Sequence, residues 1–525
     1  MLCCLGIAIY FNTFFSSFHL DDYHSFVTNP AIRHLSNLQA LWSFWPTRFV
    51  TYLTIALNYA LGQYRVFGYH LFNLIVHLGA SILVWWFTLL TLSTPAMKDN
   101  PISSHSRLVS LFVGLVFVSH PIQTQGVTYI IQRTTSLAAL FYLASLCLYI
   151  QARLLEDKER RRSRLSYAGS LLAAVLAMFT KEMTITLPLM VLLYEFCFLK
   201  DQKGMNKKTL WPFLATFLLI PLTMFLTKSV DFLQMRRVTE GPVGFTPLEY
   251  LLTQFRVMVT YLRLTFLPIH QNLDYDYPIL KSLIDPSFLV SLLLLIIILI
   301  MAQRLFSKYR LISFSIFWFF LTLLPESSII PIRDVIFEHR LYLPMVGFAL
   351  FLVSSLYELL KDKNLKVMTT LLLVIIACYS VLTYRRNFVW RDDLTLWNDV
   401  VQKSPQKARG YSNRGLAYAG QGKIKKAIAD YNMAIKIKPD YDDTYNNRGN
   451  AYALEGRLDD ALTDFNKTIK INPLYVAAYN NRGNIYAEKG DLDKAFADFN
   501  KALEINPGYV ETYNSRGVLY AQEGN

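Results

Sequence analysis

Long apolar segments alternate with short polar loops from residue 1 to about residue 390, and this alternation constrains the fold more than any other feature. A helix needs roughly 20 apolar residues to cross the hydrocarbon core of a bilayer. Across the whole chain 53% of the residues are hydrophobic and 14% are aromatic, which is unusual for a soluble protein. We therefore predict a membrane domain of about eleven helices. The candidate spans are residues 2–18, 66–91, 107–119, 136–154, 166–179, 183–199, 209–228, 287–303, 309–324, 341–360 and 366–384.

Most of the clustered basic residues lie in loops between these segments, and they predict the side that each loop faces. The formal net charge is +14, with clusters at 160–164, 203–208, 304–310 and 361–366. Lysine and arginine concentrate in cytoplasmic loops, which places the N-terminus inside and the alternate loops outside. Because the basic residues are dispersed among loops rather than gathered on one face, we exclude nucleic acid as a partner.

Residues 245–268 are apolar enough to suggest one more span. They carry Glu249, Arg256 and Arg263, and each of these charges is costly at the bilayer centre. We predict an amphipathic helix at the outer interface instead, and residues 35–60 have a similar character.

Residues 408–525 differ from the rest because their pattern recurs every 34 residues. The recurring positions are Gly415, Gly449, Gly483 and Gly517; Tyr418, Tyr452, Tyr486 and Tyr520; Ala427, Ala461 and Ala495; and Pro439, Pro473 and Pro507. The pattern resembles the tetratricopeptide repeat. Small residues let two helices approach, aromatic residues fill the gap between them, and proline ends the second helix. Terminal caps usually protect such arrays, so we expect a fragment or an early stop.

The chain thus divides near residue 390, and we predict an all-α fold. A multi-pass helical membrane domain covers 1–390, a linker or helix covers 391–407, and a tetratricopeptide-repeat α-solenoid covers 408–525. The repeats follow an odd number of predicted spans, so we expect them outside the cytoplasm. Their concave surface would dock a protein partner or acceptor, and a purely scaffolding role remains equally open.

Two adjacent carboxylates, Asp21 and Asp22, directly follow the first apolar segment. A partly desolvated carboxylate at a membrane surface suits a general base that activates a hydroxyl group. Taken alone, the pair also fits a solvated loop. With His24 it is a candidate site for a divalent cation, although the chain has no dedicated set of metal ligands.

Further ionisable side chains gather on the same predicted outer face. Arginine or lysine would bind a phosphate there, while a carboxylate accepts the proton of an acceptor hydroxyl. Ionisable residues at membrane depth are functional candidates, although any single one also fits a structural salt bridge. The members are Lys181 and Glu182, His120 and Arg133, Asp274 and Asp276, and Glu338, His339, Arg340 and Tyr342.

Six ordered motifs precede the repeats and give these residues a family context. They read HLDDY, FNLIVHLGASIL, HPIQTQGVTYIIQRTTSLAALFYL, FTKEMTITLPLMVLLYE, FRVMVTYLRLTFLPIHQNLDYDYP and EHRLYLPMVGF. In this order they resemble the transmembrane-and-tetratricopeptide-repeat glycosyltransferase-like family, one of the C-type glycosyltransferases that use polyprenyl-phosphate sugars. The resemblance implies a membrane enzyme that transfers a sugar, often mannose in eukaryotic members, from a lipid-phosphate carrier to a protein hydroxyl.

The resemblance also implies roles for individual residues. Catalysis falls to Asp21 and Asp22, and donor phosphate binding to Arg340, His339, Lys181 and Arg133. Supporting positions are Glu182, Glu338, His120, Asp274, Asp276 and Tyr342. The reaction would occur on the extracytoplasmic side of a bacterial inner membrane or an endoplasmic reticulum membrane. Attack opposite the lipid phosphate should invert the anomeric centre.

Two alternatives remain at this point. A non-enzymatic membrane anchor could present the repeats as a scaffold, although so many predicted spans exceed what an anchor needs. A transporter would need polar residues across the middle of the membrane and inverted repeats, and the sequence has neither. A divalent cation is the one cofactor that we consider.

Overall fold

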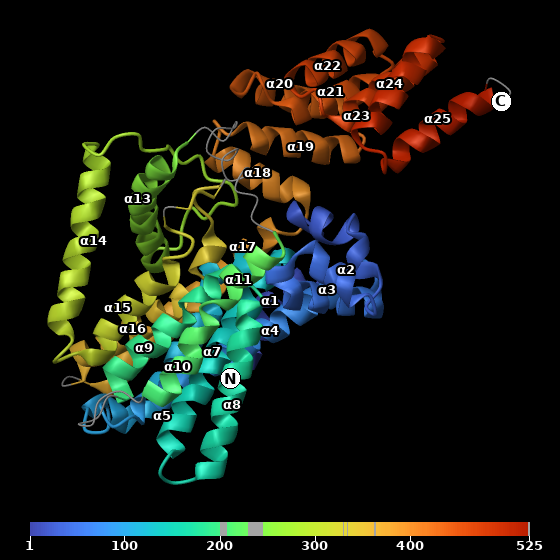
Figure 1. The fold of residues 1–525 in the computed structure, drawn as a ribbon. Helices are drawn as coiled ribbons and strands as arrows, with labels where there is room; N and C mark the ends of the chain where they lie inside the picture. Colours follow the sequence, from blue (N-terminus) through green and yellow to red (C-terminus); the bar gives the residue numbers. More distant parts are fainter. Residues whose placement is uncertain (200–206, 229–244, 329, 333, 362–363, 523–525) are drawn as a thin grey trace. The chain divides into compact units, whose positions relative to one another are not determined.

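The computed structural model describes residues 1–199, 207–228, 245–328, 330–332, 334–361 and 364–522. All elements assigned within these ranges are helices (Figure 1). The chain separates into two compact units, one formed by Met1–Leu273 and Tyr277–Asp392, the other by Asp274–Asp276 and Asp393–Asn525. The predicted all-α fold is therefore confirmed.

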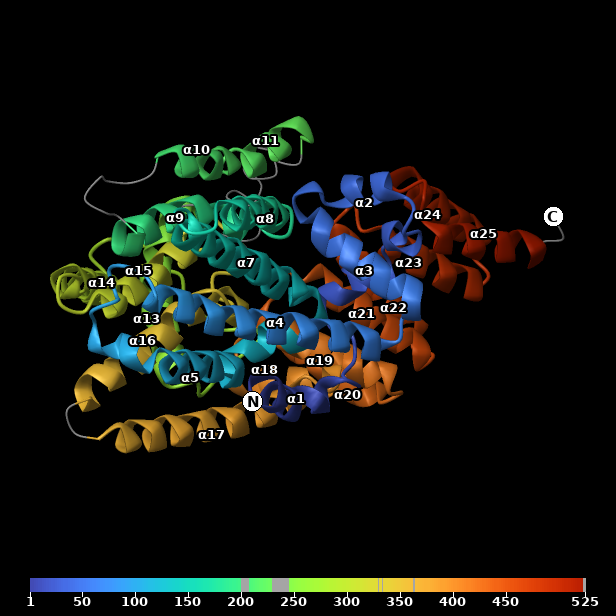
Figure 2. The ribbon, with the colours of Figure 1, turned by 90° about the horizontal axis from the view of Figure 1, so that it is seen from below.

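The first unit is a bundle built around α4 (Val66–Leu92) and α7 (Arg133–Leu155), which lie side by side with α5 (Ser106–Ser119) in Figure 2. The other α-helices of this unit are α1 (Leu2–Tyr10), α2 (Leu38–Phe44), α3 (Phe49–Gly62), α6 (Thr124–Thr128), α8 (Arg160–Met178), α9 (Leu187–Tyr194), α10 (Lys207–Thr216), α11 (Leu219–Leu226), α13 (Pro247–Phe266), α14 (Pro286–Leu305), α15 (Arg310–Leu323), α16 (Pro344–Leu360) and α17 (Leu365–Val389).

Short helical turns occupy many of the loops and begin several of the longer helices. Single 3₁₀ turns are Phe11–Thr13, Pro30–Arg33, Pro46–Arg48, Pro101–His105, Pro121–Gln123, Ile130–Gln132, Glu182–Thr186 and Glu338–Leu341, and two π-helical turns are Tyr23–Val27 and Glu195–Leu199. Four of the 3₁₀ turns start with proline, whose fixed φ angle suits the first position of a helix.

Within the described part of the first unit, seven helical segments are long and apolar enough to cross a membrane. They are Val66–Leu92, Pro101–Ser119, Ile130–Leu155, Glu182–Leu199, Lys208–Leu226, Pro286–Leu305 and Leu365–Val389, and shorter apolar helices cover Leu2–Thr13, Arg310–Leu323 and Pro344–Leu360. These helices mark the unit as a membrane domain. Neither set includes α8, which holds most of the predicted span 166–179, so the total of about eleven spans stays a prediction. Neither set includes α13, which we predicted at the interface. The predicted basic cluster at 203–208 lies largely outside the described residues.

The second unit is an array of antiparallel helix pairs. Its helices are α18 (Asp393–Lys403), α19 (Ala408–Gly420), α20 (Ile424–Ile437), α21 (Asp442–Leu454), α22 (Leu458–Ile471), α23 (Val476–Glu488), α24 (Leu492–Ile505) and α25 (Val510–Gln522). The recurring glycines allow close packing: a Cβ atom on Gly449 would lie 2.8 Å from the ring of Phe465. The predicted tetratricopeptide-repeat solenoid is therefore confirmed.

A ladder of charged pairs runs through this array at the repeat spacing. Arg448 donates to both carboxylate oxygens of Asp464 at 2.7 and 2.8 Å, and to the side chain of Asn432 in the preceding pair at 2.6 Å. The equivalent sets are Arg414 with Asp430 and Asn398, and Arg482 with Asp498 and Asn466. Because Asn398 lies on α18, the segment that we predicted as a linker or helix already follows the register of the repeats.

Candidate active site

The acidic pair lies in the loop between α1 and α2, at the start of the π-helical turn Tyr23–Val27. The preceding residue, Leu20, has a φ angle of 44°. A residue other than glycine is strained in this left-handed region, and such strain concentrates at functional sites. The turn separates the two carboxylates, since Asp22 is buried whereas Asp21 is exposed.

Asp22 holds the loop in place. Its Oδ2 atom accepts a hydrogen bond from the backbone N–H of His19 at 3.0 Å, and its Oδ1 atom accepts one from the N–H of Ile131 at 2.8 Å. Burial raises the pKa of this carboxyl to about 7, although the hydrogen bond from His19 opposes the shift. Asp22 therefore fastens the first loop to the start of the Ile130–Leu155 segment.

Asp21 is held at its backbone by Tyr129. Its N–H donates to the Tyr129 hydroxyl at 3.0 Å, and the Tyr129 ring stacks on Trp390 with centroids 5.4 Å apart. Burial, together with Asp21 and Asp22, raises the pKa of Tyr129 well above its usual range, so the phenol keeps its proton. Of the two acids, Asp21 is therefore the one that a substrate can reach.

A half-buried ion pair joins the start of α3 to the Lys181–Glu182 turn. Arg48 Nη2 lies 3.1 Å from Glu182 Oε2, and Thr47 donates to Glu182 Oε1 at 2.7 Å. The Arg48 guanidinium also lies over the Trp45 ring, 4.3 Å from its centroid. The pair fixes Arg48 beside the turn that carries Lys181.

A second ion pair involves Lys181 itself. Its Nζ atom lies 2.9 Å from Glu326 Oε1 and donates to Thr135 Oγ1 at 2.9 Å, and the two charged side chains are only 8% and 14% exposed. Burial lowers the pKa of Lys181, and Glu326 opposes that shift. Burial raises the pKa of Glu326, but Lys181 and Arg340 outweigh it and hold that pKa below its usual range. Each group thus favours the charged form of the other, as in an ion pair.

Arg340 lies next to this pair. It donates to the backbone carbonyls of Asp334 and Val335 at 2.7 and 3.0 Å. Its charge acts on Glu326. Burial lowers the pKa of Arg340, but the neighbouring tyrosines and Glu326 outweigh burial and hold that pKa above its usual range. We call Arg48, Lys181, His339 and Arg340 the basic cluster.

His339 contributes the neutral member of the basic cluster. Its side chain stacks on Phe337, with centroids 5.0 Å apart, and it is 8% exposed. Burial lowers its pKa well below the usual range, and Lys181, Arg340 and Arg48 lower it further, so the ring is neutral. Among the residues that the structure describes, the Nδ1 atom has no hydrogen-bond partner. A buried polar atom without a partner is costly, so this nitrogen can gain from a hydrogen bond to a ligand.

Tyr52 connects Asp21 to the basic cluster. Burial raises the pKa of its hydroxyl, Asp21 and Glu182 raise it further, and Arg48 lowers it. Asp21 and Arg48 therefore lie close enough to act on the same tyrosine. We therefore treat the exposed carboxylate and the cluster as one candidate site.

Arg133 has a different environment. Its Nε atom donates to Asn73 Oδ1 at 2.7 Å and its Nη2 atom to the Tyr69 carbonyl at 3.0 Å, while the guanidinium lies 4.3 Å from the Phe72 ring centroid. These contacts join α7 to α4 inside the bundle. A phosphate-binding role for Arg133 stays a prediction.

Three other predicted residues are buried in hydrogen bonds. The Glu338 carboxylate accepts from the N–H of Asn272 at 2.6 Å and from the Gln271 amide at 2.9 Å, which fixes the segment after α13. His120 Nε2 lies 3.0 Å from the Thr265 carbonyl, and the Tyr342 hydroxyl lies 2.7 Å from His77 Nδ1. All three contacts link distant segments of the first unit, and the supporting role of these residues in the reaction stays a prediction.

Asp274 and Asp276 belong to the second unit. Asp274 pairs with Arg409 at 2.6 Å and with Lys407 at 3.4 Å, and the N–H of Asp276 donates to Ser404 Oγ at 3.0 Å. Their predicted role in the reaction stays a prediction.

The predicted ligands fit a divalent cation poorly. The described residues hold no group of three or more His, Cys, Asp or Glu side chains that could bind a metal ion. Both Asp22 oxygens accept backbone N–H bonds, which leaves Asp21 and the exposed His24. Two such groups are too few for a stable site, so we derive no step through a metal.

The sequence analysis missed four residues of this site. Arg48 lies in the segment that we expected at the interface, Glu326 follows the apolar helix α15, and Tyr52 and Tyr129 lie in apolar sequence. A lone carboxylate directly after a predicted span was the available signal for Glu326. Nothing in the local sequence indicates the tyrosines.

Comparison with known protein families identifies the repeats of the second unit. The family described as "Tetratricopeptide repeat" matches residues 476–509, and the one described as "TPR repeat" matches 417–456 and 449–490. Among solved structures, the first such domain of Spaghetti bound to an HSP90 peptide is 28% identical, with a TM-score of 0.22, covering 23% of this chain and 95% of that one.

Curated relatives extend across the membrane domain as well. Protein O-mannosyl-transferase Tmtc3 of Drosophila melanogaster is 24% identical over 512 residues, which cover 84% of this chain and 55% of that protein. Protein O-mannosyl-transferase F38B6.6 of Caenorhabditis elegans is 25% identical, covering 84% and 63%, and human TMTC3 is 24% identical, covering 82% and 50%.

This chain is a homologue of the transmembrane-and-tetratricopeptide-repeat proteins. It spans between 50% and 63% of the length of these three relatives. The relationship covers more than four fifths of this chain.

Proposed function

We propose that this protein transfers a mannosyl group from a polyprenyl-phosphate carrier to a protein hydroxyl on the extracytoplasmic side of the membrane. The names of the curated relatives support the reaction class. The candidate site supports the same reaction class, because it combines an accessible carboxylate with a cluster of cations.

The main support for this proposal is the Nδ1 atom of His339, which has no hydrogen-bond partner among the described residues. It is buried among Arg48, Lys181 and Arg340, where a neutral imidazole N–H would complete a phosphate site. These three cations outnumber the two carboxylates paired with them, Glu182 and Glu326, by one. The cluster with these two partners therefore has a net charge of +1, which suits the single negative charge of a phosphodiester donor.

The proposed reaction is a direct displacement at the anomeric carbon. Asp21 accepts the proton of the acceptor hydroxyl as its oxygen bonds to that carbon. The bond between the anomeric carbon and the phosphate oxygen breaks, and its electron pair leaves with the lipid phosphate toward the basic cluster. Attack opposite the leaving group inverts the anomeric centre. The phosphate is already a good leaving group, so no strong general acid is required.

Asp22 and Tyr129 position the base in this scheme. Asp22 holds the loop through two backbone N–H bonds, and Tyr129 accepts the N–H of Asp21. We further propose that the repeats dock the acceptor protein, so that the hydroxyl and the donor meet on the same side of the membrane.

Replacing His339 by alanine should raise the donor KM by about 10- to 100-fold, since a hydrogen bond to a charged group contributes roughly 1.5–3 kcal/mol. The measurement is transfer from a polyprenyl-phosphate mannose to a protein acceptor by the purified protein in proteoliposomes. The matched control is His24→Ala, which removes an exposed imidazole and should leave the donor KM unchanged. Equal donor KM values for both variants would refute the phosphate site.

The alternative function is a membrane-anchored scaffold that uses only the repeats. It predicts no sugar transfer by the wild-type protein with any polyprenyl-phosphate donor, while partners still bind. A scaffold function does not require the neutral His339 imidazole beside three cations, whereas the transferase function does. Transfer that disappears in an active-site variant but persists without the repeats would assign the chemistry to the membrane domain alone.

The proposed orientation has its own test. Gln421 lies in an exposed turn of the repeats, so a cysteine at this position should react with a membrane-impermeant maleimide in intact cells. A cysteine in place of Lys158, in the basic loop after α7, should react only after lysis. The reverse pattern would place the repeats in the cytoplasm.

A further inference from the structure

We infer that Gln125 binds a hydroxyl group of the donor's mannosyl residue and thereby takes part in selecting the sugar; this inference rests on the proposed function. Gln125 lies on α6, is 1% exposed, and was not among the predicted site residues. Its side-chain Nε2 atom has no hydrogen-bond partner among the described residues. A buried amide in this state gains a hydrogen bond when a ligand supplies an oxygen atom.

The unbonded atom of this amide is a hydrogen-bond donor. Gln125 Oε1 accepts the backbone N–H of His339 at 2.7 Å. A backbone N–H can only donate, so the atom that faces it must be the amide oxygen, and the other atom must be the NH₂ group. Gln125 therefore offers N–H donors beside the basic cluster, and the oxygen of a sugar hydroxyl accepts such a bond.

Two contacts hold α6 against the segment that carries His339. One is the bond from the His339 N–H to Gln125. The other is a close approach at Gly126, where a Cβ atom would lie 2.6 Å from the Tyr342 ring. A larger residue at this position would push α6 away from that segment. The donor group of Gln125 is therefore fixed in place before any sugar binds, which lowers the entropy cost of binding.

The segment that begins with Gln125 also reaches the acidic pair. Further along it, the Tyr129 hydroxyl accepts the N–H of Asp21 at 3.0 Å, and the N–H of Ile131 donates to Asp22 Oδ1 at 2.8 Å. One end of this segment therefore contacts the basic cluster, and the other end holds the loop that carries the proposed base.

The displacement that we propose requires the sugar to lie between these two ends. The anomeric carbon lies between the attacking oxygen, which is next to Asp21, and the leaving phosphate, which is next to His339. Gln125 belongs to the segment that joins the two, so the sugar lies beside it. A neutral amide adds no charge there, which suits the uncharged hydroxyl groups of a sugar rather than a second anion.

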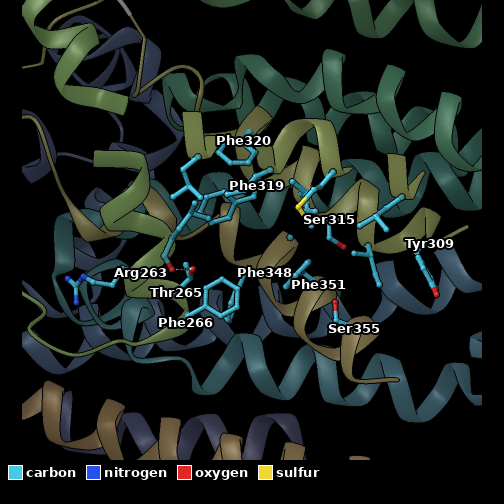
Figure 3. A pocket seen from close by; sticks show the side chains of 18 of the residues that line it. Arg263, Thr265, Phe266, Tyr309, Ser315, Phe319, Phe320, Phe348, Phe351 and Ser355 are labelled. Atoms are coloured by element: carbon cyan, nitrogen blue, oxygen red, sulfur yellow. Dashed lines mark hydrogen bonds between the residues drawn. The ribbon is translucent and has the colours of Figure 1, made fainter. Parts of the chain in front are cut away.

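The apolar groove between α13, α14, α15 and α16 does not offer such donors. It has a volume of about 730 Å³, and phenylalanine rings such as Phe266, Phe319 and Phe348 form much of its wall (Figure 3). Few polar atoms there could replace the water that a sugar hydroxyl loses on burial. Recognition of the hydroxyl groups is therefore assigned to buried polar atoms such as Gln125 Nε2.

The test combines Gln125→Met with mannose donors that each lack one hydroxyl group. The variant keeps the length of the side chain and removes its N–H donors. Polyprenyl-phosphate mannose should bind the purified full-length variant about 10-fold or more weakly than the wild type. One deoxymannose donor should bind the wild type weakly by a similar factor, because a site built to bond a hydroxyl rejects the analogue without it. The same donor should bind the variant as well as the mannose donor does.

This coupling between one side chain and one hydroxyl separates sugar binding from a purely structural role. Gln151→Met is the matched control, because Gln151 lies near the C-terminal end of α7 and accepts a hydrogen bond from Ser166 at 3.0 Å. It should bind every donor as the wild type does. Polyprenyl phosphate without sugar should distinguish Gln125→Met from the wild type much less than the mannose donor does.

Gln125→Glu keeps the inference testable if Gln125→Met does not fold. Its carboxylate still accepts the His339 N–H but has no N–H to donate. A fluorine atom in place of the recognised hydroxyl can accept a hydrogen bond and cannot donate one. The deoxyfluoro donor should therefore bind the wild type better than the deoxy donor, whereas Gln125→Glu should bind the two equally.

An equal loss of affinity for all donors, including the one without sugar, would overturn the inference, because Gln125 would then act only through His339 or the phosphate. Unchanged affinities in Gln125→Met would overturn it as well. All of these measurements report binding rather than transfer. A wild type that binds the donors and transfers no sugar would reject the proposed function, while the pattern of affinities would still decide the role of Gln125.

Discussion

Replacing Asp21 by asparagine should reduce the turnover of sugar transfer by about 10²- to 10⁴-fold, the usual contribution of a general base. The change is nearly isosteric and the side chain is exposed, so the fold should be kept. The N–H bond from residue 21 to Tyr129 also remains, because it comes from the backbone. The donor KM should change little, since the phosphate contacts lie in the basic cluster. Turnover is measured with saturating polyprenyl-phosphate mannose and acceptor.

Asp22→Asn is the matched control for this experiment. An asparagine side chain at this position can accept a hydrogen bond only at its carbonyl oxygen, so its NH₂ group would face the N–H of either His19 or Ile131. We expect a loss of stability of about 1–3 kcal/mol, seen as a lower thermal transition, because a buried donor loses its partner. Wild-type turnover in Asp21→Asn, or an equal loss in both variants without any difference in stability, would contradict the assignment of Asp21 as the base.

Replacing Lys181 by methionine should destabilise the membrane domain by about 3–5 kcal/mol, because it leaves Glu326 buried without its nearest cation. The side chain of Glu326 is only 14% exposed, so water cannot take over the role of the lysine. Arg340 offsets part of this cost, since its charge also acts on Glu326. Thermal unfolding in detergent gives the change in stability.

The double variant Lys181→Met with Glu326→Gln separates the ion pair from the rest of the site. It should recover part of the lost stability, because the uncompensated charge is gone. Lys158→Met, at an exposed position in a loop, should change stability by less than about 0.5 kcal/mol. A Lys181→Met variant as stable as Lys158→Met would show that the ion pair contributes little. Donor binding should stay weak in the double variant, because the phosphate has still lost a cation.

The repeats were predictable in detail because their contacts are local. The spacing of 34 residues predicts small residues where two helices approach and aromatic rings in the gap, and the structure has Gly449 against Phe465. The ladder of Arg448, Asp464 and Asn432 follows the same spacing, although we did not predict it. Local patterns of this kind need no knowledge of distant segments.

The site was predictable only as a set of residues on one face. Asp21 and Asp22 are adjacent and chemically identical, so the sequence could not tell which one is buried. The N–H of Ile131, more than 100 residues away, decides it. The sequence did not predict Arg48 and Glu326 as site residues for the same reason, because each belongs to the site through an ion pair with a distant segment.

The charged ladder in the repeats has a consequence for how this array can evolve. Each arginine is satisfied by an aspartate in its own helix pair and an asparagine in the preceding one. Duplicating or deleting a block of 34 residues would therefore restore every pair across the new junction. The length of the array can therefore change by whole repeats without any compensating substitution. Recombination between neighbouring copies in the gene would produce proteins of different length that still fold.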